Sequence, residues 1–170
     1  LHDGLIAAAA ASWLRSKAAE LAEQQKPWFL AVNLVNPHDV MFYDADAPGT
    51  PKRPPPGLSP IERDPVDPLY AKRWDFDLPA SHKQPLDAPG RPAAHVDYLK
   101  SHDWMVAPIG NAEARWRRRP NYYLNCIRDV DRNIAAVLDE LEASGLADRT
   151  IVILTADHGD IDGAHQMHSK

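Results

Sequence analysis

The chain has 170 residues, of which 19 are Lys or Arg and 24 are Asp or Glu, so its formal net charge is −5. This length suits one ordinary domain or part of a larger one, and the 44% hydrophobic and 25% charged content is typical of a globular protein. The negative charge argues against non-specific nucleic-acid binding, and the single cysteine, Cys126, excludes an internal disulfide framework. The longest apolar stretch, residues 5–14, is too short to span a bilayer.

The amino-terminal part predicts a helix followed by a strand. Residues 3–25 are rich in alanine, the strongest helix former, and their larger apolar residues recur at roughly helical spacing. Pro27 ends this pattern, because proline disfavours helical geometry in the residue before it. Residues 28–35 (WFLAVNLV) then form a short apolar run, which is typical of a buried, parallel strand.

The middle of the chain is rich in proline. The sequence has 16 prolines, and all except Pro27 fall between Pro37 and Pro120. Residues 37–115 show little periodicity, so we expect a long irregular insertion with short helices near residues 95–102. Such an excursion either carries specificity for a substrate or is a plain solvated insertion.

The last part has the clearest pattern. Residues 121–144 carry apolar side chains on one helical face, and Gly145 follows as a C′ residue with Leu146 behind it, which predicts a Schellman ending. Residues 150–156 (TIVILTA) are β-rich and apolar, and they lead into the polar run of residues 157–160 (DHGD).

Together these elements predict an α/β fold with a mostly parallel sheet flanked by helices. We expect residues 1–170 to be part of a single domain, which the family resemblance described below implies is catalytic. Within it, residues 1–36 form a helix and a strand, 37–115 the Pro-rich insertion, and 116–170 a helix, a strand and a loop that binds a metal.

Both predicted strands end in polar residues that can act as ligands. The first runs into residues 36–39 (NPHD) and the second into residues 157–160, and parallel strands place their carboxyl ends at one edge of a sheet. A carboxylate beside an imidazole suits a divalent cation, and Gly159 allows a close backbone approach. A turn that caps a following helix explains the same residues equally well.

Three ordered blocks, which cover roughly half the chain, share a wider pattern. The first block, residues 26–39, leads to His38. The second is a helix motif formed by Asp131, Ile134, Ala135, Val137 and Leu138. The third joins Asp157-His158-Gly159 to Gly163-Ala164-His165 and Lys170. In this order the blocks resemble the sulfatase family of the alkaline phosphatase superfamily.

The resemblance implies a role for five residues. Asp157 and His158 match the pair that ligates a divalent cation, most often Ca²⁺, with Mg²⁺ or Mn²⁺ as other possibilities. His38 matches a histidine that contacts the sulfate group or protonates the leaving alcohol, and Lys170 matches a lysine that pairs with sulfate oxygens. His165 lies at a Gly-x-His position where substrate contacts occur, although a structural role there is as common.

The sequence also departs from the family. Sulfatases take their nucleophile from a Cys/Ser-x-Pro-x-Arg motif that is converted to formylglycine, and no such motif occurs here. Cys126 is best interpreted as a small buried hydrophobic residue. We therefore expect an internal fragment, inactive alone, with the formylglycine and an Asp-Asp metal-binding pair located upstream.

The implied function is hydrolysis of the sulfate monoester of a small molecule or carbohydrate, with no nucleic-acid partner. One alternative is a phosphoester or phosphonate hydrolase of the same superfamily, and another is a truncated homologue that binds anions without turnover. The sequence does not indicate which alcohol is esterified.

Several other residues allow two interpretations. Asp160 either supports the metal site or holds a turn. The basic run of residues 117–119 (RRR) is more typical of a solvated helix start than of a surface that meets an anionic substrate. Three tryptophans could stack on a sugar or aryl group, namely Trp74, Trp104 and Trp116. Tryptophan more commonly anchors a hydrophobic core.

Overall fold

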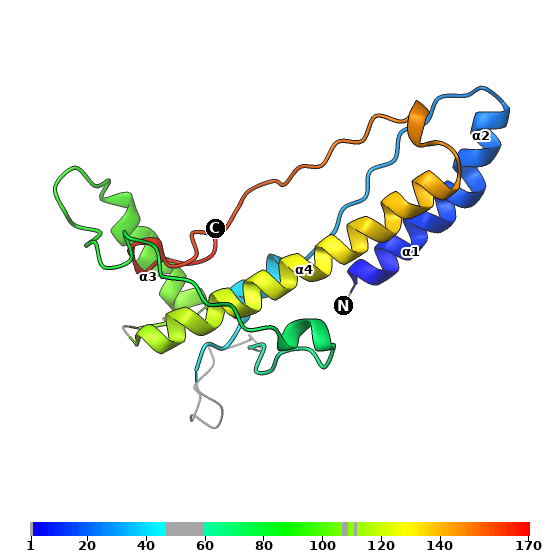
Figure 1. Cartoon of the computed structure of the whole chain (residues 1–170). Coiled ribbons are helices and arrows are strands. Elements are labelled where there is room, and N and C mark those ends of the chain that lie inside the picture. Colours follow the sequence, from blue (N-terminus) through cyan, green and yellow to red (C-terminus); the bar gives the residue numbers. More distant parts are fainter. Residues whose placement is uncertain (1, 47–59, 107–108, 111) are drawn as a thin grey trace. The chain divides into compact units, whose positions relative to one another are not determined.

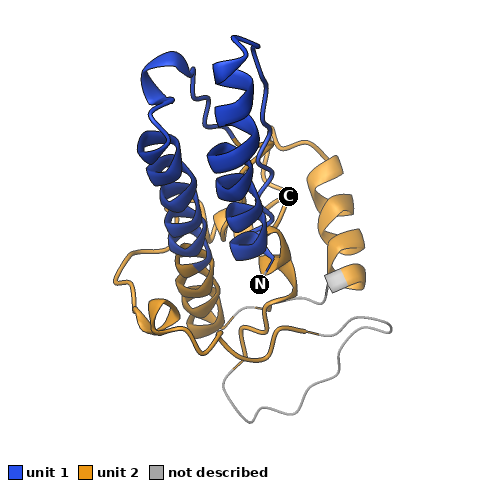
Figure 2. Ribbon diagram, turned by 90° about the vertical axis from the view of Figure 1, so that its right-hand side faces the viewer, with its two compact units in different colours: residues 1–37, 126–155 blue, residues 38–125, 156–170 orange. Residues whose placement is uncertain are grey.

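The computed structural model describes residues 2–46, 60–106, 109–110 and 112–170. The chain divides into two compact units. Unit 1 comprises Leu1–Pro37 and Cys126–Thr155, and unit 2 comprises His38–Asn125 and Ala156–Lys170 (Figure 2). Each unit therefore combines segments that lie far apart in the sequence.

A helical segment opens unit 1. Helix α1 (Asp3–Trp13) continues through the π-helical turn η1 (Leu14–Ala18) into α2 (Ala19–Glu23) (Figure 1). This confirms the helix predicted for residues 3–25, to within two residues at its end. The buried carboxylate of Asp3 accepts hydrogen bonds from the backbone N–H groups of Val35 (2.7 Å) and Asn36 (3.0 Å), which ties the start of α1 to the end of the extended segment.

The long helix α4 (Glu113–Ala143) contributes residues to both units. It begins earlier than predicted and includes Pro120. Its end matches the prediction, because Gly145 adopts a φ of 70° and the N–H of Leu146 bonds to the carbonyl of Leu141 (3.4 Å), while that of Gly145 bonds to Glu142 (2.9 Å). These are the two bonds of a Schellman motif.

The core of unit 1 lies between its helices. Leu14 and Ala18 of η1 pack with Leu141 of α4 and with Leu146, and all four are buried. The Schellman ending thus places Leu146 in the core, which is the apolar contact that usually accompanies this motif. The ring of Trp28 packs against this cluster and meets Trp13 edge-on at 5.4 Å.

The predicted parallel sheet is wrong. The described residues contain no β-strand, and the isolated bridge between Tyr43 and Ile61 lies in neither predicted strand. Residues 28–35 and 150–156 are extended (Figure 1), but within the described part of the chain neither belongs to a ladder. A strand needs a neighbour that satisfies its backbone N–H and C=O groups, and an apolar run does not supply that neighbour.

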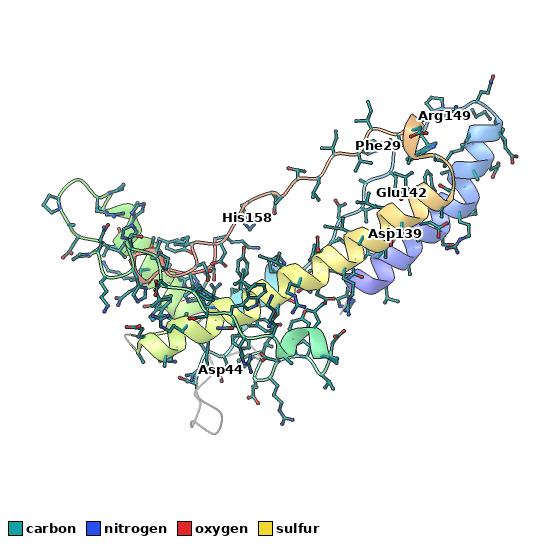
Figure 3. The ribbon with its side chains drawn as sticks, in the orientation of Figure 1. Phe29, Asp44, Asp139, Glu142, Arg149 and His158 are labelled. Carbon is teal, nitrogen blue, oxygen red and sulfur yellow. The ribbon has the colours of Figure 1, made fainter. Side chains whose placement is uncertain are left out.

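The two extended segments also differ in burial. In residues 28–35 the exposure alternates, so that Trp28 and Leu30 pack on the helices while Phe29, which Figure 3 labels, is 88% exposed. Ile151 and Ile153 are 91% and 80% exposed. The side chains of residues 151–154, which the sequence pattern assigned to a buried strand, are therefore exposed to solvent.

Unit 2 has less regular structure. Its helices are η2 (His38–Phe42), η3 (Pro68–Ala71), α3 (Ala94–Val106), the first part of α4 and η5 (Ala164–Gln166), whereas η4 (Ala147–Arg149) belongs to unit 1. Helix α3 confirms the helix expected near residues 95–102.

The irregular chain of unit 2 is held by side chains of α4. The buried amide of Asn125 donates to the carbonyls of Tyr70 and Lys72 (both 3.0 Å) and accepts from the indole N–H of Trp74 (3.0 Å). The ring of Tyr122 stacks on Tyr43 with centroids 4.1 Å apart. These contacts replace the backbone ladder that an irregular segment lacks. In the described part of the chain, we find no helix whose length and apolarity would let it cross a membrane.

Candidate functional site

The candidate site is an open hollow in unit 2, beside the carboxyl-terminal loop. Its lining consists of His158, Gly159, Asp160, Ile161, Ser169 and Lys170. His158 lies where the extended segment enters this loop (Figure 3). The two ends of residues 158–170 therefore meet at one surface, which brings His158, a predicted metal ligand, together with Lys170, a predicted sulfate-binding residue.

The side chains of Asp157 and His158 lie next to each other. The imidazole Nδ1 of His158 lies 2.8 Å from the carbonyl oxygen of Gly159, which only accepts hydrogen bonds, so Nδ1 is the donor and Nε2 is the ring nitrogen that could bind a cation. Nε2 lies 3.4 Å from Oδ2 of Asp157. Two ligands of one Ca²⁺, at about 2.4 Å and at right angles, are about 3.4 Å apart, so this pair fits a shared cation.

The pair alone does not make a complete metal centre. Among the described residues, no group of three or more His, Cys, Asp or Glu side chains is placed to hold a metal ion. Ca²⁺ usually takes about six to eight oxygen ligands. Asp157 and His158 can therefore supply one side of a coordination sphere, with both side chains accessible from solvent.

Lys170 lies at the other side of the hollow. Its backbone carbonyl accepts a hydrogen bond from the hydroxyl of Tyr98 on α3 (3.0 Å), and the same hydroxyl lies 3.4 Å from the carbonyl of His168. The backbone at Lys170 is thus fixed by α3. Its ammonium group is a compact positive charge of the kind that binds sulfate or phosphate oxygens.

A buried ion pair holds the loop between these residues. The guanidinium of Arg119, on α4, is 1% exposed and donates to both carboxylate oxygens of Asp160, at 3.0 and 2.7 Å. It also donates to Asp162 at 3.2 Å. Oδ1 of Asp160 accepts the backbone N–H groups of Asp162 (2.8 Å) and Ser169 (3.1 Å), so one carboxylate connects both ends of the loop.

Aromatic residues support the inner side of the loop. The buried ring of His168 meets His102 edge-on at 4.2 Å and Trp116 at 6.0 Å. Burial lowers the pKa of His168 to about 2, and the positive charge of Arg119 and the neighbouring His102 act in the same direction. The Nδ1 of His82 lies 2.7 Å from the carbonyl of Gly163. His168 is therefore a neutral packing residue at ordinary pH.

Gly163 turns the loop at a φ of 96°, in the region that favours glycine. An added Cβ would contact Trp116 and His82 at 3.6–3.7 Å. This glycine lets the loop close over the aromatic residues.

Three predicted site residues do not line this hollow, namely Asp157, His38 and His165. Asp157 directly precedes His158 in the sequence. His38 begins η2, is half exposed and lies 3.1 Å from the carboxylate of Asp39. His165 lies in η5, where its backbone N–H bonds to the carbonyl of Ser81 and its ring faces the carbonyl of Gln84 at 3.4 Å. Neither residue lines the hollow, and their substrate contacts stay predictions.

Sequence reasoning missed Arg119. The run of residues 117–119 suggested a solvated helix start, yet Arg119 is buried and its two neighbours donate to backbone carbonyls, Arg117 to Phe76 (2.8 Å) and Arg118 to Ala45 (2.6 Å). Asp160, for which the sequence allows two roles, accepts hydrogen bonds from two backbone N–H groups of the loop, and its relation to a metal site stays a prediction. The only signal in the sequence was an arginine on the apolar face of a helix.

Comparisons with known proteins agree on one family. Residues 2–170 match the sulfatase family. A curated protein from Formosa agariphila named "Sulfatase" is 32% identical over 105 residues, which make up 54% of this chain and 19% of that protein. The chain thus spans about a fifth of the length of this relative. No solved structure matches the chain.

Proposed function

Because the chain belongs to the sulfatase family, we propose that the protein hydrolyses a sulfate monoester with the help of a divalent cation, most simply Ca²⁺. The observation that carries this proposal is the hollow that His158 and Lys170 share. An imidazole that could hold a cation and a lysine ammonium group on one open surface suit an anionic sulfate ester better than a neutral substrate.

The proposed roles follow from the charge that develops during the reaction. Cleavage of the bond between sulfur and the leaving oxygen places negative charge on the non-bridging oxygens and on the leaving alcohol. Lys170 binds the sulfate oxygens as a point charge. Asp157 and His158 would hold the cation, which when bound supplies Lewis-acid stabilisation of the same oxygens.

Two roles rest on the family resemblance alone. His38 is proposed to contact the sulfate group or to protonate the leaving alcohol, and His165 to contact the substrate. The sequence contains no Cys/Ser-x-Pro-x-Arg motif, so the proposal assigns no nucleophile to these 170 residues.

The test compares ester hydrolysis by single variants of the protein expressed from its whole gene. Lys170→Ala and Asp157→Ala are each expected to lower kcat/KM for p-nitrophenyl sulfate by about 100-fold or more, as loss of an electrostatic stabiliser does. Lys100→Ala is the control, because Lys100 is an exposed lysine of the same unit that pairs with Asp97 one turn away, at 3.1 Å, and does not line the hollow. It should change kcat/KM by less than about twofold.

The outcomes separate the three candidate functions. Hydrolysis of p-nitrophenyl phosphate in place of the sulfate would favour a phosphoester hydrolase. Binding of inorganic sulfate without any turnover would favour a non-catalytic homologue. Activity that survives both substitutions at Lys170 and Asp157 would contradict the proposed site.

A further inference from the structure

We propose that Asp160, clamped by Arg119, is a positioning residue that sets the distance between the cation ligands and Lys170. This inference rests on the proposed function, because it assigns a task to the loop that joins the two halves of that site. In this proposal the buried ion pair fixes the backbone between the two sides of the hollow. Neither Asp160 nor Arg119 contacts the substrate.

The first argument is the two-point contact within the ion pair. Arg119 presents two parallel N–H groups to the two oxygens of Asp160, and the side chains are 1% and 7% exposed. A bidentate pair fixes the orientation of both groups, which a single contact does not. Water does not screen a pair buried to this degree, so its geometry is enforced strongly.

The second argument is what Asp160 does with its remaining acceptor capacity. Its Oδ1 accepts the N–H of Ser169, the residue before Lys170, while its own backbone follows Gly159 and His158 directly. The backbone pair between the N–H of Ile161 and the carbonyl of Ser169 (3.0 Å) closes the same junction. One carboxylate therefore ties the backbone beside His158 to the backbone beside Lys170.

The third argument is that the clamp is anchored to a regular element. Arg119 extends from α4, a helix of 31 residues, whereas the loop itself contains only the short helix η5. Sites supported by a helix keep their geometry better than sites supported by loops alone. The distance between the two functional sides of the hollow thus depends on α4.

The test is a double-mutant cycle in the protein expressed from its whole gene, with inorganic sulfate as the probe. Arg119→Lys keeps the positive charge and removes the planar fork. We expect it to weaken sulfate binding about tenfold. In a Lys170→Met background the same substitution should change sulfate binding by less than about twofold, because no ammonium group remains to be positioned.

Arg115→Lys is the matched control. Arg115 lies on α4 one turn before Arg119 and pairs with Asp46 at 2.7 Å, outside the loop. It should leave sulfate binding within about twofold of the unaltered protein. Asp160→Asn is the more severe second variant. Its amide oxygen still accepts the two backbone N–H groups, but its amide NH2 replaces one acceptor of Arg119 and the buried guanidinium loses its charge partner. It should weaken sulfate binding at least as much as Arg119→Lys does, and with the same dependence on Lys170.

The possible failures are distinct. Equal weakening by Arg119→Lys with and without Lys170, or equal effects of Arg119→Lys and Arg115→Lys, would overturn the positioning role and leave the proposed function intact. If the unaltered protein neither binds inorganic sulfate nor hydrolyses p-nitrophenyl sulfate, the proposed function is overturned and this inference with it. Circular dichroism of each variant checks that it is folded.

Discussion

Asp162 is a partly buried carboxylate whose surroundings disfavour its charge. Burial raises its pKa to about 6, the nearby carboxylate of Asp160 adds to the effect, and the guanidinium of Arg119 opposes it. An acid whose pKa is higher in the folded than in the unfolded chain favours folding while it is protonated. Its stabilising contribution is present below about pH 4 and is lost as the pH rises to about 6.

We therefore expect Asp162→Asn to stabilise the chain at neutral pH. The amide removes the buried charge and keeps an oxygen that can accept from Arg119. The free energy of unfolding of the variant, relative to the unaltered chain, should rise by about 1 kcal/mol between pH 4 and pH 7. Thermal unfolding followed at both pH values measures this difference. A constant difference across that pH range would contradict the raised pKa.

The predictability of individual residues depended on how much of their role is local. Asp157 and His158 stand in a contiguous motif, and the structure places their side chains 3.4 Å apart. Arg119 meets Asp160 across 41 positions of sequence, so its burial depends on a tertiary contact that no local pattern records. From sequence alone, a run of three arginines predicts a solvated surface, because the tertiary partner of each guanidinium is not visible there.

At the level of elements, the end of α4 depends on a glycine in the left-handed region. Gly145 has a φ of 70° and no atom within 4 Å of the position that a Cβ would take. Backbone strain is therefore the only cost of a side chain here, and it amounts to about 1 kcal/mol for a non-glycine residue. Gly145→Ala should lower the free energy of unfolding by this amount.

Gly4→Ala is the matched control for that substitution. Gly4 lies within α1, and its added Cβ would make an ordinary contact with the side chain of Asn133 at 3.8 Å. Alanine is the better helix former, so this variant should gain about 0.5–1 kcal/mol. Thermal unfolding should thus shift in opposite directions for the two variants, and a shift in the same direction would contradict the assigned backbone role of Gly145.

Helices were more predictable than strands for a physical reason. A helix satisfies its backbone within one segment, so the apolar periodicity of residues 121–144 and the glycine after it were sufficient to find α4. A strand is completed by its neighbours, and residues 28–35 and 150–156 have no ladder within the described residues. Apolar composition identified extended backbone in both places and was wrong about the sheet.

For the molecule as a whole, the uncovered apolar segment of unit 1 has consequences in solution. Residues 151–154 are all apolar and exposed, and β-rich apolar segments without charge tend to associate. In size-exclusion chromatography the 170-residue chain on its own should elute earlier than its 18.9 kDa mass predicts, and earlier still at higher protein concentration. Ile153→Lys should reduce this association, because a charge interrupts the run.

Ala143→Lys is the control for the chromatography, since it adds the same charge at an exposed position of α4, outside the apolar run. Its elution should match that of the unaltered chain. If Ala143→Lys and Ile153→Lys reduce association equally, net repulsion and not the apolar segment would be responsible.

The hydrogen bonds of Asp160 also close residues 160–169 into a ring. They join the backbone of residues 160–162 to that of Ser169, so the neck of this ring is fixed while its length is not. The entropy of closing a ring changes only slowly with its length. A change in the length of the ring near His165 and Gln166 should therefore leave the neck, and the residues on either side of it, in the same register.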